Sequence, residues 1–174
     1  MSRVRSVAGA LAGMMALAMA VLWWMGGTVA EYQSEVMIGA APERVYPFLT
    51  QPGKLKLWIG GLVDSQPIGD AVLRVGARSR ETVEENGQRE EMITEITGFE
   101  PGRLLEVRIS SGSFEGSNRF VLDAATGGTH ITQTLRFRLK GFARLLSPFL
   151  KGTVQRKLDS DLQQLKRTVE ASGA

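Results

Sequence analysis

The chain of 174 residues contains no cysteine and only one histidine, His130. The lack of cysteine excludes disulfide bonds, zinc sites with thiolate ligands and cysteine nucleophiles. One histidine is too few for a metal site built from several imidazoles. There is also no run of Lys or Arg and no Gly-rich phosphate-binding motif. We therefore expect no metal, no cofactor and no nucleic-acid partner.

Charge is absent from residues 7–27, which read VAGALAGMMALAMAVLWWMGG. A helix of this length rises about 32 Å, close to the roughly 30 Å of a bilayer's hydrocarbon core. Trp23 and Trp24 stand near its far end, where indole rings favour the headgroup layer. We predict that residues 1–30 form a membrane anchor, which makes the membrane a partner through residues 7–27.

The charges around this segment predict its orientation. Arg3 and Arg5 precede it and Glu31 and Glu35 follow it, so the N-terminus is expected in the cytoplasm and the remainder outside. The alternative is a signal peptide cleaved near Ala30, which would give a secreted or periplasmic protein. The apolar run is longer than the roughly 7–15 residues of a typical signal peptide, which favours the retained anchor.

Residues 31–174 form the second predicted unit, one domain with nineteen basic and eighteen acidic residues. Residues 32–38 read as a strand. Pro42 and Pro52 suit the first turns of two short helices, over 42–49 and from 52 to near Gly60. After that the hydrophobic pattern changes to period two, which is typical of antiparallel strands.

Three short turns organise these strands. Asn86-Gly87 is a strong hairpin signal and places Glu81 opposite Met92. A turn at Ser111-Gly112 would place Leu105 opposite Asn118, and a turn at Gly127-Gly128 would place Asn118 opposite Phe137. Asn118 faces inward in both hairpins, so the registers agree. The pattern therefore predicts six antiparallel strands that share one apolar face.

The C-terminus supplies a cover for that face. Ser147-Pro148 is a good start for a helix, and apolar residues then recur at helical spacing through Val169. Before this helix, Lys140, Phe142 and Arg144 belong to a segment that is both basic and apolar. This segment is either a flap near lipid headgroups or a cap packed on the sheet.

Three stretches of the sequence are informative: PERVYPFLTQPGKLKLWIGGL, VGARSRETVEENGQREEMITEITGFEPGRLLEVRI and GTHITQTLRFRLKGFARLL. Together with the order of the elements, they resemble the SRPBCC superfamily of START-like, helix-grip proteins, near its polyketide cyclase/dehydrase branch. The resemblance implies an α+β helix-grip fold. In it a curved antiparallel sheet of about seven strands, two short helices and a long C-terminal helix enclose a cavity. Such proteins bind lipids, sterols, polyketides, quinones or hormones, and only some are enzymes.

The inward-facing positions and the resemblance together predict the cavity wall. We expect it to contain Trp58, Ser79, Glu81, Met92, Thr94, Val107, Asn118, Phe120, Gln133, Leu135, Phe149 and Leu158. Glu81 is the one weak catalytic candidate, because burial beside Met92 would raise its pKa and make it a general base. His130 points outward and is expected to be an exposed strand-end residue.

Three functions fit these features. The first is a membrane-anchored, non-catalytic carrier or sensor for a hydrophobic small molecule such as a lipid, a quinone or a polyketide. The second is a polyketide cyclase-like enzyme that uses Glu81 or His130 as its acid or base. The third is a protein-interaction module whose cavity is filled by its own side chains.

Overall fold

The computed structural model describes residues 19–21, 23–24, 27–85 and 87–173, apart from the side chains of 146–149 and 151. Most of the predicted membrane segment 7–27 and the turn residue Asn86 therefore lie outside the described residues. Among the residues that are described, no helix is long and apolar enough to cross a membrane.

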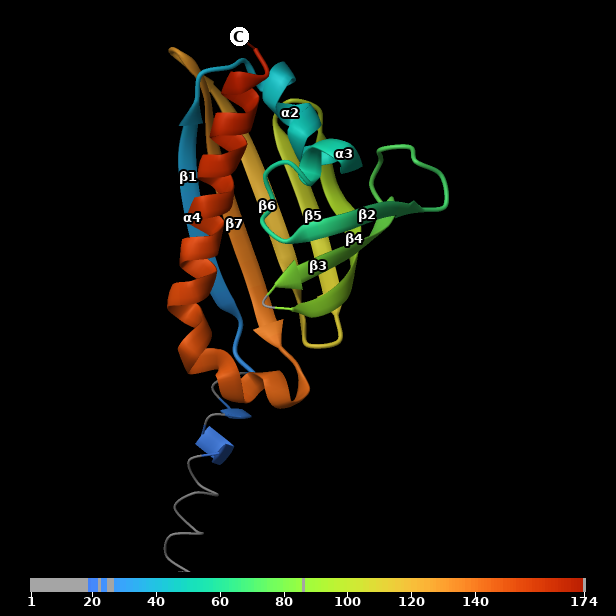
Figure 1. Ribbon diagram of the computed structural model, residues 1–174, viewed down its shortest axis with the longest axis vertical. Helices are drawn as coiled ribbons and strands as arrows, with labels where there is room; N and C mark the ends of the chain where they lie inside the picture. Colours follow the sequence, from blue (N-terminus) through green and yellow to red (C-terminus); the bar gives the residue numbers. More distant parts are fainter. Residues whose placement is uncertain (1–18, 22, 25–26, 86, 174) are drawn as a thin grey trace, which may run out of the picture.

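In the part of the chain that the structure describes, seven strands form one antiparallel sheet in the order β1-β7-β6-β5-β4-β3-β2 (Figure 1). The strands are β1 (Ala30–Ile38), β2 (Leu62–Ile68), β3 (Arg78–Glu85), β4 (Gln88–Glu100), β5 (Leu104–Ser111), β6 (Phe114–Ala125) and β7 (Gly128–Leu139). After residue 30 the helices among the described residues are α2 (Pro42–Thr50), α3 (Pro52–Leu55), the 3-10 helix η1 (Gly141–Leu146) and α4 (Ser147–Ala171). The predicted helix-grip fold is confirmed.

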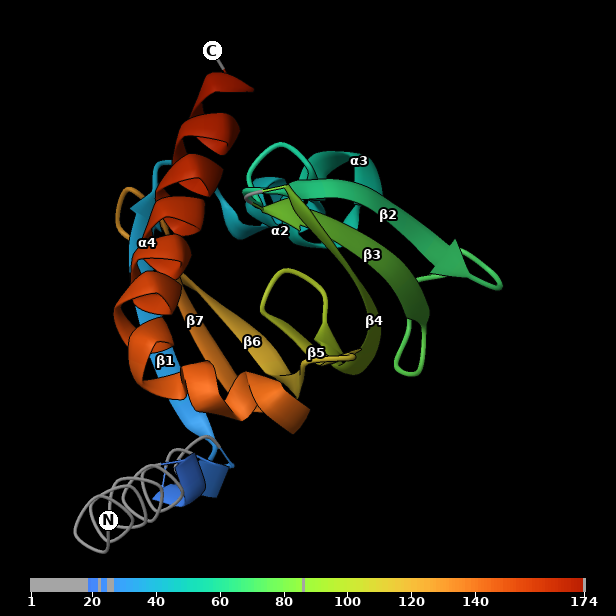
Figure 2. The ribbon, with the colours of Figure 1, turned by 60° about the horizontal axis from the view of Figure 1, so that its bottom comes forward.

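The sheet curves because two of its strands carry bulges. The register shifts between Leu62 and Asp64 of β2 and between Ile96 and Gly98 of β4. An extra residue in one strand bends it and increases its twist. Figure 2 shows β2, β3 and β4 arching away from β1 and β7, so that the sheet has a concave face.

Helix α4 lies against β1 and carries the centre of the core. Leu162, Leu165 and Val169 of α4 are fully buried and pack with Ile38 of β1 in one hydrophobic cluster. A hydrogen bond of 2.6 Å from Ser34 Oγ to Asp159 fixes the position of the helix along the strand. Because α4 follows the β1 edge of the sheet, the arch formed by β2–β4 stands apart from it (Figure 2).

The first hairpin has the predicted register, with Glu81 opposite Met92. The predicted registers of the other two are wrong by two residues. Asn118 lies opposite Val107 rather than Leu105, and opposite Leu135 rather than Phe137. The turns centre one residue away from the expected positions, and a shift of two residues keeps every side chain on its predicted face.

Helix α3 is shorter than predicted, because it ends at Leu55 instead of continuing toward Gly60. The backbone N–H of Leu57 bonds to the carbonyl of Lys54, and that of Trp58 to the carbonyl of Leu55. These bonds span three residues rather than four, so the chain tightens into turns after the first helical turn. The tightening directs Trp58 into the core, where its exposed fraction is 3%.

Candidate ligand-binding cavity

A cavity of about 590 Å³ lies between the concave face of the sheet, α3 and α4. This volume is within the range of about 300–1,000 Å³ found for small-molecule sites. Eleven of the twelve residues predicted for its wall line it: Trp58, Ser79, Glu81, Met92, Thr94, Val107, Asn118, Phe120, Gln133, Leu135 and Leu158. The side chain of the twelfth, Phe149, lies outside the described residues. The open volume differs from the filled interior that an interaction module with a collapsed cavity requires.

Most of the wall is apolar. Trp58 and Phe120 meet edge to face with ring centroids 6.1 Å apart, and the indole N–H of Trp58 donates 2.8 Å to the carbonyl of Phe48. The indole is thereby fixed as part of the wall, with its polar group satisfied. Val107 and Ile109 of β5 continue the apolar surface across the floor of the cavity.

One polar cluster lies on β3 and β4. The hydroxyls of Ser79 and Thr94 are 2.6 Å apart, and the Thr94 hydroxyl donates 3.4 Å to Glu81 Oε1. Burial raises the pKa of the Glu81 carboxyl above its ordinary value of 4.5, while the two hydroxyls act in the opposite direction. The cluster therefore places against the ligand space a carboxyl that is protonated more easily than one in water.

The substitution Glu81→Gln tests this environment through the pH dependence of stability. Well below pH 4.5 the carboxyl is protonated in both folded and unfolded chains. As the pH rises through the raised folded pKa, the wild type must ionise a buried carboxyl and loses stability, whereas glutamine does not. The free energy of unfolding of Glu81→Gln, minus that of the wild type, is therefore expected to increase from about pH 4 to about pH 7.

Glu115→Gln is the matched control with the opposite sign. Glu115 is partly exposed and paired with Arg138, whose guanidinium lowers the pKa of the Glu115 carboxyl. Removing this charge should cost stability at neutral pH and leave it unchanged in acid. Urea denaturation of both variants across this range measures the effect, and a flat difference for Glu81→Gln would contradict the buried-carboxyl interpretation.

A second polar pair lies on β6 and β7. Gln133 is 4% exposed, and its Nε2 donates 3.1 Å to Asn118 Oδ1. The other amide atom, Gln133 Oε1, is buried without a hydrogen-bond partner. Both residues line the cavity. An unpaired buried acceptor costs about 1–3 kcal/mol, so a hydrogen-bond donor that reached this oxygen would be stabilising.

Sequence reasoning missed Ser65 and the loop over 70–73, which also line the cavity. Ser65 lies opposite Glu81 on the neighbouring strand, and its hydroxyl is likewise buried without a partner. The bulge after Leu62 is the physical reason for the omission. A strict period-two pattern from Leu62 places Ser65 on the outer face, whereas the extra residue turns it inward.

A polar clasp joins α4 to the segment after α3 and was also not predicted. Lys157 Nζ donates 2.7 Å to the carbonyl of Gly60 and lies 2.8 Å from Asp161 Oδ2, while Asp161 Oδ1 accepts 3.0 Å from the N–H of Gly60. Lys157 and Asp161 belong to the cavity wall. The clasp joins α4 to the segment that leads into β2, and its polar groups satisfy one another.

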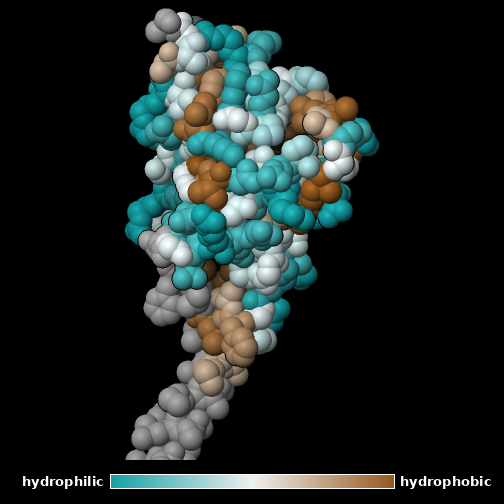
Figure 3. Space-filling model, turned by 45° about the vertical axis from the view of Figure 1, so that its right-hand side comes forward, coloured by the Kyte–Doolittle hydropathy of each residue, from teal (hydrophilic) through white to brown (hydrophobic). Residues whose placement is uncertain are grey.

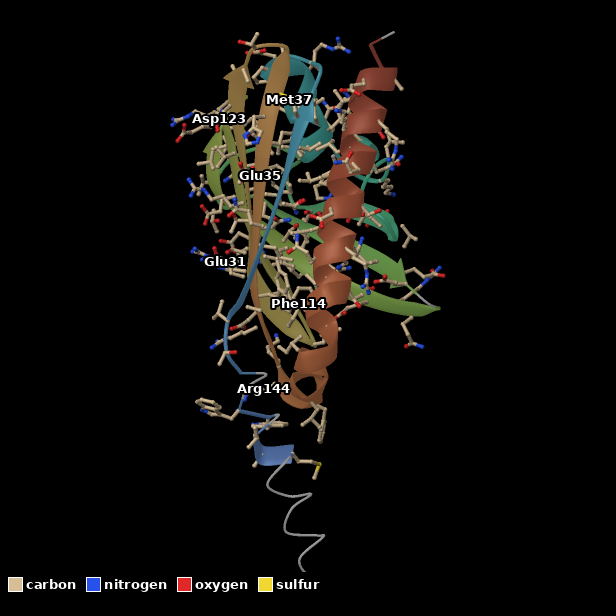
Figure 4. All side chains as sticks on the ribbon, turned by 90° about the vertical axis from the view of Figure 1, so that its left-hand side faces the viewer. Glu31, Glu35, Met37, Phe114, Asp123 and Arg144 are labelled. Atoms are coloured by element: carbon tan, nitrogen blue, oxygen red, sulfur yellow. The ribbon has the colours of Figure 1, made fainter. Side chains whose placement is uncertain are left out.

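The remaining candidate, His130, lies on the outer face of the sheet. It is opposite Met37 on β1 and Asp123 on β6, and its Nε2 is 3.4 Å from Glu35 Oε2. Figure 4 shows Glu31, Glu35 and Met37 along β1 on this side. Glu81 and His130 are therefore on opposite faces, and the geometry does not bring them together as an acid–base pair.

The curved sheet, the covering C-terminal helix and the mainly apolar cavity define a helix-grip protein. A family model described as "Polyketide cyclase / dehydrase and lipid transport" matches residues 29–170. The chain belongs to this family.

Solved structures share the fold at low identity. The ZhuI aromatase/cyclase from Streptomyces sp. R1128 is 14% identical with a TM-score of 0.71, and the match covers 84% of this chain and 97% of that one. TTHA0849 from Thermus thermophilus is 23% identical with a TM-score of 0.68, covering 83% and 100%. Ara h 8.0201 is 18% identical with a TM-score of 0.64, covering 83% and 99%. No curated protein sequence matches the chain.

Proposed function

We propose that this protein is a membrane-anchored carrier or sensor that binds a hydrophobic small molecule, such as a lipid, a quinone or a polyketide, without chemical change. The cavity of about 590 Å³ is the observation that carries the proposal. Transfer of a ligand into it would gain roughly 25 cal/mol per Å² of apolar surface removed from water. The lipid-transport function in the family description supports the same conclusion.

Attachment to the membrane through residues 7–27 is part of this proposal. It is supported by the uncharged sequence of that segment and by large apolar side chains at the same end of the domain. Trp24 and Phe142 are 75% and 83% exposed, and the guanidinium of Arg144 lies over the ring of Trp23 at 5.3 Å. Figure 3 shows hydrophobic surface where the N-terminal segment meets the domain, and Figure 4 shows Arg144 there. Aromatic and basic side chains of this kind suit a lipid headgroup layer.

The test uses the full chain, kept in the membranes in which it is expressed. Resistance to an alkaline wash is expected if residues 7–27 form an anchor, and release by the wash would contradict attachment. Native mass spectrometry after extraction into nanodiscs should then show one apolar small molecule bound to each chain. A chain without any adduct, after exposure to lipid and quinone mixtures, would contradict the carrier function.

A matched pair of substitutions makes this test specific to the cavity. Val107→Trp fills the cavity floor, whereas Val63→Trp introduces the same side chain at a position that is 45% exposed. Loss of the adduct is expected for Val107→Trp alone. Equal adduct levels in both variants would place the ligand elsewhere.

A cyclase-like enzyme is the second candidate, favoured by the buried Glu81 carboxyl and by the fold shared with the ZhuI aromatase/cyclase. The partners of Glu81 are the hydroxyls of Ser79 and Thr94, not a second acid or base. The same mass spectrum separates the candidates. A carrier retains one unchanged species, whereas a dehydrating cyclase yields two that differ by one water.

A further inference from the structure

Two polar atoms of the cavity wall have unused hydrogen-bonding capacity. Gln133 Oε1 and the Ser65 hydroxyl are both buried without a partner, and their residues are 4% and 7% exposed. Buried polar atoms in folded proteins are nearly always paired. Because both residues line the same cavity, a molecule that fills the cavity is in a position to supply the missing bonds.

These atoms belong to two separate polar clusters. One comprises Gln133 and Asn118 on β7 and β6, and the other comprises Ser65, Glu81 and Thr94 on β2, β3 and β4. The nearest members of the two clusters, Asn118 and Thr94, are two strands and two residues apart, which is about 12 Å along the sheet. Gln133 and Ser65 themselves lie five strands apart, toward opposite sides of the concave face. Apolar Val107 and Ile109 on β5 lie between them.

The charges of the wall disfavour an anionic ligand. The wall contains two basic residues among those described: Lys157 is engaged by Asp161 and Gly60, and Arg78 is exposed to solvent. The Glu81 carboxyl faces the same space and supplies no positive charge to pair with a carboxylate. A buried anion without a paired cation carries a large desolvation cost. A fatty-acid head group would therefore find no unpaired cation in the buried part of the described wall.

We propose that the cavity selects an uncharged, elongated apolar molecule with a hydroxyl group at each end, one bonded to Gln133 and the other to the Ser65–Glu81 side. This inference rests on the proposed ligand-binding function and names the chemical class of its ligand. Each hydroxyl supplies a donor, to Gln133 Oε1 at one end and to the Ser65 hydroxyl or the Glu81 carboxyl at the other. The apolar body between them covers Val107 and Ile109.

Rigid biphenyls of matched shape test the class. Isothermal titration of the full chain in nanodiscs, with empty nanodiscs as reference, would compare biphenyl, 4,4′-dihydroxybiphenyl and biphenyl-4-carboxylate. The diol is expected to bind about tenfold or more tightly than biphenyl, because its hydroxyls supply hydrogen-bond donors that biphenyl lacks. The carboxylate is expected to bind more weakly than biphenyl.

Three nearly isosteric variants assign the effect to residues. Gln133→Met and Ser65→Ala should each weaken binding of the diol about five- to tenfold and leave biphenyl unchanged. Thr97→Val is the control, because the Thr97 hydroxyl is also buried without a partner but lies outside the cavity wall. It should change neither affinity.

The possible results separate the two levels of the proposal. If biphenyl binds and the diol binds no tighter, or if the carboxylate binds best, the ligand class is wrong while hydrophobic binding stands. The class is also wrong if Gln133→Met and Ser65→Ala weaken both ligands equally. If none of the three probes binds, the proposed binding function is overturned together with the class.

Discussion

Replacement of Leu162 by alanine is expected to lower the free energy of unfolding by about 3 kcal/mol. Leu162 lies on α4 with an exposed fraction of 0% and belongs to the cluster that joins this helix to Val36 and Ile38 of β1. Truncation removes the transfer energy of the side chain and leaves a cavity that close-packed neighbours fill only in part. Pulse proteolysis of the full chain in urea measures the loss.

Leu57→Ala is the matched control for this prediction. It is the same truncation at a site that is 53% exposed, so a change below about 0.5 kcal/mol is expected. Similar losses in the two variants would mean that α4 does not depend on its buried face for its attachment to the sheet.

Gly128→Ala is expected to destabilise the protein by about 3 kcal/mol or more, near the upper end of single-substitution effects. Gly128 opens β7 with φ of +149°, and a Cβ there would lie 1.9 Å from the carbonyl oxygen of Ile38. Relief of this overlap requires β7 to move away from the end of β1. Such movement breaks pairing that continues along both strands.

A substitution at the neighbouring Gly127 separates the effect of steric overlap from the effect of an unfavourable backbone conformation. Gly127 also has a positive φ, +91°, but a Cβ at this position meets nothing within 4 Å. Gly127→Ala should therefore cost only about 1–2 kcal/mol, the strain of a left-handed conformation. If pulse proteolysis gave the same loss for both variants, the close approach of Gly128 to β1 would not be the cause.

The sequence predicts which side chains of each strand point inward. In two hairpins it does not predict which residues lie opposite one another on neighbouring strands. Alternation of polar and apolar residues fixes which side chains point inward, and a shift by two residues leaves that alternation intact. Asn118 is the clearest example, since it faces the cavity in both the predicted and the observed registers while its neighbours differ. Turn geometry, with Gly127 at positive φ, decides between such registers.

The cavity wall was predictable where the strands are regular and not where they bulge or where distant segments meet. Glu81, Thr94 and Gln133 lie on uninterrupted alternating stretches, so their inward orientation follows from the sequence. Ser65 follows a bulge, and its orientation depends on a residue inserted out of phase. The contacts of Lys157 and Asp161 with Gly60 join positions about a hundred residues apart, and local periodicity carries no information about such pairs.

The pairing of β1 with β7 also sets the order in which the domain can be completed. Ala30 lies beside Phe137, so β1, the first strand of the sheet to be synthesised, can pair only after β7, the last, has been made. Closure over such a long loop is slow compared with the formation of the local hairpins between β3 and β6. Until β7 has been made, β1 has no neighbour in the sheet and α4 does not yet exist to cover it. A chain that terminates before β7 would therefore carry an exposed strand edge, with the aggregation hazard of such edges, rather than a smaller stable domain.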